Sequence, residues 1–132
     1  MNEIHRFNFP LFCRIGKKNH HFNINNYRNN HFMINNKTKK IYHDWVYEQA
    51  LVKRLKPVTG QMAVELRLYR SDKRKIDKSN VLSIHLKYFL DGLVNCKIIP
   101  DDNDLIVLEE YFRPTTWGVD EGYVEIKLIV LK

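Results

Sequence analysis

The chain has few of the features that mark disulfide scaffolds, membrane proteins or phosphate-loop enzymes. Its two cysteines, Cys13 and Cys96, form no close pairing motif, so we expect free thiols in a reducing compartment. No apolar run of about 18 residues is present, and residues 1–10 lack the apolar core of a signal peptide. A Gly-rich phosphate loop, a nucleophile elbow and a CxxC motif are also absent. The sequence therefore predicts a soluble cytoplasmic protein with no membrane partner.

Charge is unevenly distributed along the chain. Its 132 residues carry a formal net charge of +7, and this length predicts one domain, residues 1–132, with its own core. Residues 1–78 hold 17 Lys and Arg against 6 Asp and Glu, whereas residues 79–132 hold 5 against 9. A basic first half suits contacts with phosphates, and an acidic second half suits a metal site.

Hydrophobic periodicity predicts alternating strands and helices. We expect strands over residues 3–9, 61–70 and 122–131, where apolar residues alternate, and over residues 105–112. Helices are expected over residues 39–56, capped by Thr38 and stopped by Pro57, and over residues 80–93. This order predicts an α+β fold, with two main helices packed on one mixed β-sheet.

Residues 16–38 are rich in Asn, His and Lys and show no period, so they predict a long basic loop. Cations in and beside this loop alternate with aromatic rings, as in surfaces that bind nucleic acid. A disordered low-complexity segment is the alternative. Zinc is not expected, because the spacing of the nearby ligand types fits no standard zinc finger: Cys13, His20, His21 and His31.

The stretch from Asp77 to Asp102 carries the clearest chemical pattern. Asp77 and Ser79 are N-cap types, apolar residues then recur at three- and four-residue intervals, and Pro100 leads into Asp101-Asp102. Lys87 and Asp91 share one stripe of the helix. We expect these carboxylates to gather round one point, as a hard divalent cation requires. A cap, an i, i+4 pair and an ordinary turn are the alternative.

At these residues the chain resembles the RusA family of Holliday junction resolvases. Asp77-Lys78-Ser79-Asn80 matches the family's D-x-[DS]-N opening, and Lys87 stands four residues before Asp91-Gly92-Leu93. The pair Asp101-Asp102 follows ten and eleven residues after Asp91, as in the family. Residues 25–28 and 38–42 look like two further landmarks, so the similarity covers most of the chain.

The resemblance implies an Mg²⁺- or Mn²⁺-dependent endonuclease that cuts branched DNA as a homodimer, in a bacterial or phage setting. It implies metal ligands at Asp77, Asp101 and Asp102. The implied catalytic set is Asp77, Asn80, Lys87, Asp91 and Asp102. Together with the basic pattern it gives a DNA-binding set of Lys17, Lys18, Arg28, Lys39, Lys40, Arg74 and Lys75.

Two departures from the family pattern leave other functions open. Ser79 stands where the best-known members carry a second catalytic Asp, and the segment between Asn80 and Lys87 is four residues longer, about one helical turn. The alternatives are a nucleic-acid-binding relative that has lost catalysis and a structural protein with a fortuitous acidic turn.

Overall fold

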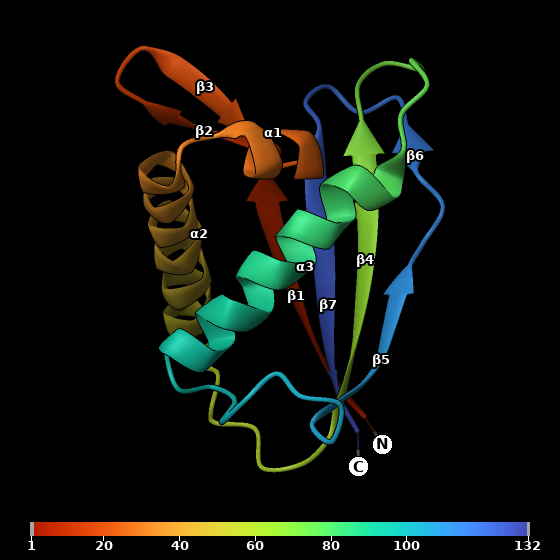
Figure 1. Ribbon diagram of the computed structural model, residues 1–132. Coiled ribbons are helices and arrows are strands. Elements are labelled where there is room, and N and C mark those ends of the chain that lie inside the picture. Colours follow the sequence, from red (N-terminus) through yellow and green to blue (C-terminus); the bar gives the residue numbers. More distant parts are fainter. Residues whose placement is uncertain (1, 132) are drawn as a thin grey trace.

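The computed structural model describes residues 2–131, which form an α+β domain (Figure 1). The strands are β1 Glu3–Pro10, β2 Phe12–Ile15, β3 Lys18–His21, β4 Met62–Arg70, β5 Val107–Phe112, β6 Thr116–Trp117 and β7 Tyr123–Val130. The helices are α1 Ile24–Asn29, α2 Phe32–Val52 and α3 Lys78–Asn95. No helix within residues 2–131 is both long enough and apolar enough to cross a bilayer.

The main sheet is mixed and five-stranded, in the order β1-β7-β4-β5, with β6 also paired to β4. β7 runs antiparallel to β1 and β4, whereas β5 and β6 run parallel to β4. Side chains alternate along β7, so that Val124, Ile126 and Leu128 are fully buried while Glu125 and Lys127 are half-buried on the other face. α3 lies across the buried face (Figure 1).

Helix α3 buries one broad face against the sheet and another against α2. Leu82, Phe89 and Leu93 are fully buried in the shared core. Gly92 lets the two helices approach closely, because a Cβ placed there would lie 3.0 Å from a methyl carbon of Val46 on α2. This contact, together with the core, fixes both ends of α3 relative to the rest of the domain.

β1 is an edge strand, and α2 covers part of its free edge. The backbone N–H of Asn8 donates to Gln49 Oε1 at 3.1 Å, and Gln49 Nε2 donates back to the Asn8 carbonyl oxygen at 2.9 Å. The side-chain amide thus forms with Asn8 the pair of hydrogen bonds that a neighbouring strand would form.

The predicted fold class, the edge strand β1, the strands β4 and β7 and the helix α3 are confirmed, with ends within two residues. The predicted long loop over 16–38 is wrong. It contains β3, α1 and the first turns of α2, and β2 and β3 form a hairpin whose turn includes Gly16 at φ +63.

The helix predicted over residues 39–56 starts earlier than expected, because α2 begins at Phe32 with His31 as its N-cap. Thr38 is not a cap. It is buried in the helix, where its hydroxyl donates to the Asn35 carbonyl oxygen at 3.0 Å. Tyr42 rather than Leu51 belongs to the buried face.

Candidate functional site

Asp77 caps α3, as expected, and its carboxylate is exposed. Oδ1 accepts from the Ser79 hydroxyl at 2.6 Å and from the Ser79 backbone N–H at 3.0 Å. These hydrogen bonds to the charged form lower the pKa of Asp77, the hydroxyl contributing most. Ser79 is therefore the side-chain donor to Asp77. Asn80 lies half-buried in the first turn.

Asp91 and Lys87 lie farther along α3 and face different surroundings. Asp91 is half-buried and forms an ion pair with Lys39 of α2, with Oδ2 and Nζ 3.1 Å apart. His43, one turn after Lys39, is half-buried beside them, and burial lowers its pKa. Lys87 is exposed. Asp91 thus joins the two helices, and its partner Lys39 is not a free cation.

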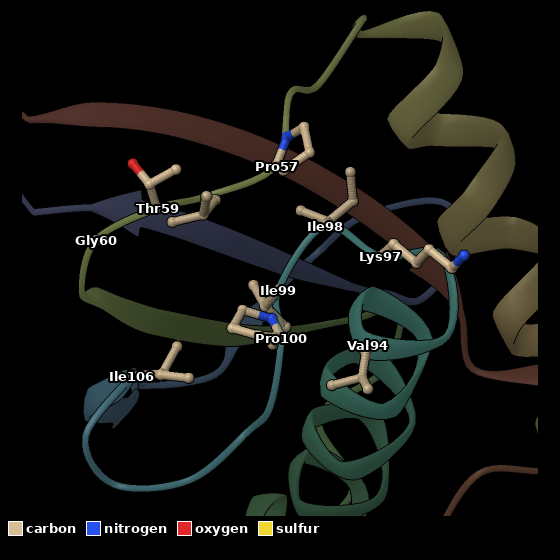
Figure 2. A pocket seen from close by; sticks show the side chains of 10 residues that line it. Pro57, Thr59, Gly60, Val94, Lys97, Ile98, Ile99, Pro100 and Ile106 are labelled. Carbon is tan, nitrogen blue, oxygen red and sulfur yellow. The ribbon is translucent and has the colours of Figure 1, made fainter.

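The other acids of the pattern lie in residues 101–104, Asp101-Asp102-Asn103-Asp104, which we term the acidic loop. Buried Ile98 and Ile99 precede it and buried Val107 follows, so apolar side chains anchor both of its ends. Figure 2 shows Ile99, Pro100 and Ile106 around an apolar cavity of about 590 Å³ at the base of this loop. The cavity contains no carboxylate, and the acids lie outside it.

Within the acidic loop, Asp101 is held by local hydrogen bonds. It accepts from the Asp102 backbone N–H at 2.8 Å and from Asn103 Nδ2 at 3.0 Å, and these bonds lower its pKa, the Asp102 bond first. Asp101, Asp102 and Asp104 are all exposed.

Glu110 of β5 also faces the acidic loop, and the sequence reasoning missed it. Partial burial raises the pKa of Glu110, and the charges of Asp104 and Asp102 raise it further. The signal in the sequence is only weak, since Glu110 is the second of two adjacent glutamates three residues after Val107 in β5. The loop and the strand together crowd three carboxylates.

One copy of the chain does not bring Asp77 together with Asp101 and Asp102. α3 has 18 residues, so its ends are about 27 Å apart. The acidic loop lies near the start of β4, where the Met62 N–H donates to the Ile106 carbonyl oxygen at 2.8 Å, whereas Asp77 follows the end of β4. Figure 1 shows the two segments at opposite ends of the sheet. Within residues 2–131, no three His, Cys, Asp or Glu side chains are placed to hold one metal ion together.

The predicted DNA-binding residues fall into two groups. Lys17 and Lys18 are exposed at the β2–β3 turn, Arg28 is exposed in the last turn of α1, and Lys75 is exposed before α3. The others are engaged in ion pairs: Lys39 with Asp91, Lys40 with Asp44 at 3.4 Å, and Arg74 with Asp72 at 3.0 Å.

Asp72 is the centre of a small ion-pair network before α3. It contacts Arg74 and also Arg70, whose Nη2 lies 3.1 Å from Asp72 Oδ1. Hydrogen bonds from Arg74, above all, lower the pKa of Asp72 to about 2. Arg70 and Arg74 are thereby held to Asp72, in the segment that precedes Asp77.

Comparison with known proteins yields no family model that matches the chain and no curated protein that matches it.

Proposed function

We propose that this protein is a divalent-metal-dependent endonuclease of the RusA kind, which cuts branched DNA as a homodimer. Asp77, Asp101 and Asp102 are its metal ligands, and Lys87 stabilises the negative charge that develops on the phosphate. A bound Mg²⁺ or Mn²⁺ would orient water and stabilise the leaving oxygen during phosphodiester hydrolysis. The proposal depends on the spacing of these residues and on their state in the fold.

The observation that carries the proposal is which aspartates lack a cationic partner. Asp44, Asp72 and Asp91 each form an ion pair with a lysine or arginine. Within the described part of the chain, the ion pairs include neither Asp77 nor either residue of the Asp101-Asp102 pair. Asp77, Asp101 and Asp102 are therefore exposed and available to a cation, as are Asp104 and Asp120 outside the motif, whereas Asp91 is held by Lys39. Local hydrogen bonds keep Asp77 and Asp101 ionised.

Dimerisation follows from the geometry if these acids serve one ion. A single copy separates Asp77 from Asp102 by the length of α3, so a site that contains both needs two copies packed with opposite ends adjacent. Two-fold symmetry then generates two equivalent sites, one for each strand of a symmetric junction. Lys17, Lys18 and Arg28 supply the exposed cations that bind the DNA backbone.

A catalytically inactive DNA-binding relative is the second candidate, and one contact favours it. The Ser79 hydroxyl, at the position of an acid in the best-known members, donates to Asp77 and occupies part of its hydrogen-bonding capacity. This arrangement offers a metal fewer carboxylate oxygens than an Asp would.

The test is nicking of a four-way junction and of a linear duplex of matched sequence, with and without Mg²⁺. We expect Mg²⁺-dependent nicks in the junction, and a fall of about 10³-fold or more in Asp102→Asn, since metal stabilisation is worth several kcal/mol. Asp44→Asn, which removes a carboxylate from α2, is the control and keeps its activity. Salt-dependent DNA binding without nicking would favour the inactive relative. The absence of both DNA binding and nicking would favour a structural protein.

A further inference from the structure

Trp117 has no role in the proposed site so far, yet its position is unusual. The chain has only two tryptophans. Trp45 packs partly buried against the core, whereas Trp117, on the two-residue strand β6, is 46% exposed. Several aliphatic and aromatic side chains of this protein are more exposed, but an exposed indole also offers a broad flat ring that can stack on a ligand.

The strand register places Trp117 on the face of the sheet that α3 covers. Trp117 pairs with Arg70, the last residue of β4, and the Gly118 N–H donates to the Arg70 carbonyl oxygen at 3.0 Å. Thr116 points to the opposite face, where its hydroxyl lies 3.5 Å from Arg67 Nη1. Since side chains alternate along a strand, the indole lies on the α3 side.

That position is the end of the sheet from which the chain enters α3. β4 ends at Arg70, beside Trp117, and seven residues later Asp77 caps the helix on the same face. Figure 1 shows β6 and the start of α3 at one end of the sheet. Trp117 and the Asp77 part of the proposed site therefore lie at the same end of the sheet and on the same face.

The segment that leads from β4 into α3 is rich in cations, with Ile76 exposed within it, and the exposed acids Asp120 and Glu121 follow Trp117. Between Arg70 and Asp77 the chain carries three exposed cations, Lys73, Arg74 and Lys75. Asp72, the one acid among them, is already paired with Arg70 and Arg74. A protein-binding surface would surround an anchoring indole with further apolar area, whereas a ring among cations matches a nucleic-acid strand, with a base for the ring and phosphates for the cations.

We propose that Trp117 is a stacking platform for an unpaired nucleotide base beside the phosphate that Asp77 serves; this inference rests on the proposed function. In a continuous duplex both faces of each base are covered by neighbouring bases, so the indole can stack only where a base is exposed, at a branch point or in a single strand. Trp117 thus selects branched or frayed DNA, and Lys73 and Lys75 hold the adjoining phosphates.

The test uses tryptophan emission without divalent metal, so that binding is measured apart from cleavage. Wild type and Trp117→Phe are titrated with a four-way junction, a single-stranded oligonucleotide and a blunt duplex, with saturation followed independently by gel mobility. We expect the junction and the single strand to quench wild-type emission, because stacking on a base quenches indole, while Trp117→Phe, which retains Trp45, shows no such quenching. Trp45→Phe, in which Trp117 is the sole emitter, should quench as wild type does.

Affinity supplies the second measurement. Trp117→Ala should bind the junction about tenfold or more weakly, on the scale of one lost base stack, and bind the blunt duplex unchanged, while Trp117→Phe keeps most of the affinity. An equal fractional change in emission on junction addition in wild type and Trp117→Phe, or equal junction affinity in Trp117→Ala, overturns the inference. Quenching by DNA that is never nicked in Mg²⁺ would refute the nuclease and leave Trp117 a DNA-binding residue.

Discussion

The two ends of α3 carry the same functional group in opposite surroundings. At the N-terminal end, Asp77 is held by Ser79, lies at the positive end of the helix dipole and follows a segment with four cations. At the C-terminal end, Asp102 and Asp104 meet another carboxylate, Glu110, whose pKa they help to raise. Hydrogen bonds and cations stabilise the ionised form of Asp77. In the acidic loop, by contrast, the negative charges of Asp102 and Asp104 disfavour ionisation of Glu110.

This difference indicates where a cation is needed. The N-terminal end already has its counter-charges, and adding a metal there alone would gain little. The C-terminal end has an excess of negative charge that a cation would relieve. Under the proposed function, the two ends meet only across two copies, so that the cation-rich segment of one copy approaches the acidic loop of the other.

The largest expected effect comes from joining the two ends in a mixed dimer. Asp77→Asn and Asp102→Asn homodimers should each lose nicking by about 10³-fold or more. If one site takes Asp77 from one copy and Asp102 from the other, a mixed dimer retains one intact site. Randomly mixed chains should then recover about a quarter of the wild-type sites, which nicking of a four-way junction measures.

Two different affinity tags allow the mixed dimer to be purified, and Mn²⁺ binding gives a readout independent of cleavage. The tagged mixture of wild type with Asp44→Asn is the control. If the mixed dimer neither nicks nor binds Mn²⁺ better than its parents, the two ends of α3 do not share a site.

A smaller effect is expected from changing the N-terminal end to resemble the C-terminal one. Ser79→Asp removes the hydroxyl that donates to Asp77 and adds a carboxylate beside it, so the Mg²⁺ concentration for half-maximal nicking should fall about tenfold. Ser79→Ala removes the donor alone and should not lower that concentration. An unchanged or higher Mg²⁺ requirement in Ser79→Asp would mean that Asp77 does not contact the metal.

The smallest effect concerns stability at the C-terminal end. Because the folded-state pKa of Glu110 is raised above its usual value of 4.5, its ionised form destabilises the fold at neutral pH. This destabilisation of the fold disappears as the pH falls through the raised pKa of Glu110 and below its usual pKa. Glu110→Gln should therefore raise the melting temperature at pH 7, by at most about 2 °C for a largely exposed group, and show no gain near about pH 4.

Glu121→Gln, at the other end of the sheet, is the control for removal of one carboxylate. A gain in Glu110→Gln that persists at low pH would show that repulsion in the acidic loop is not its cause.

The sequence predicted the regular part of the fold because its periods are strong there. β7 alternates and α3 repeats at helical spacing, so burial could be read residue by residue. The hairpin, α1 and the start of α2 were missed because Asn, His and Lys have weak preferences and the segment buries few side chains, among them Phe22 and Cys13. Tertiary contacts determine the structure of this segment, and the spacing of apolar residues in the sequence does not reveal those contacts.

The sequence identified the residues of the candidate site better than it predicted their positions relative to one another. Asp77 as a cap and Asp101-Asp102 as an exposed turn follow from local chemistry. The helix sets the distance between its own ends, but the direction of the connection over residues 96–100, and so the separation of Asp77 from Asp101-Asp102, required the structure. The roles of Ser79, Glu110 and Lys39 required the three-dimensional structure, because each depends on a neighbour's orientation or on a residue distant in sequence.

The pairing of Gln49 with Asn8 has a consequence for how copies of this chain can meet. Open sheet edges recruit further strands, and a β1–β1 junction between two copies would join their five-stranded sheets into one continuous sheet. One amide group on α2 occupies the backbone N–H and carbonyl of Asn8, toward the C-terminal end of that edge. Self-association must then use side-chain surfaces, whose chemistry can be specific, rather than the backbone, whose chemistry is the same in every protein.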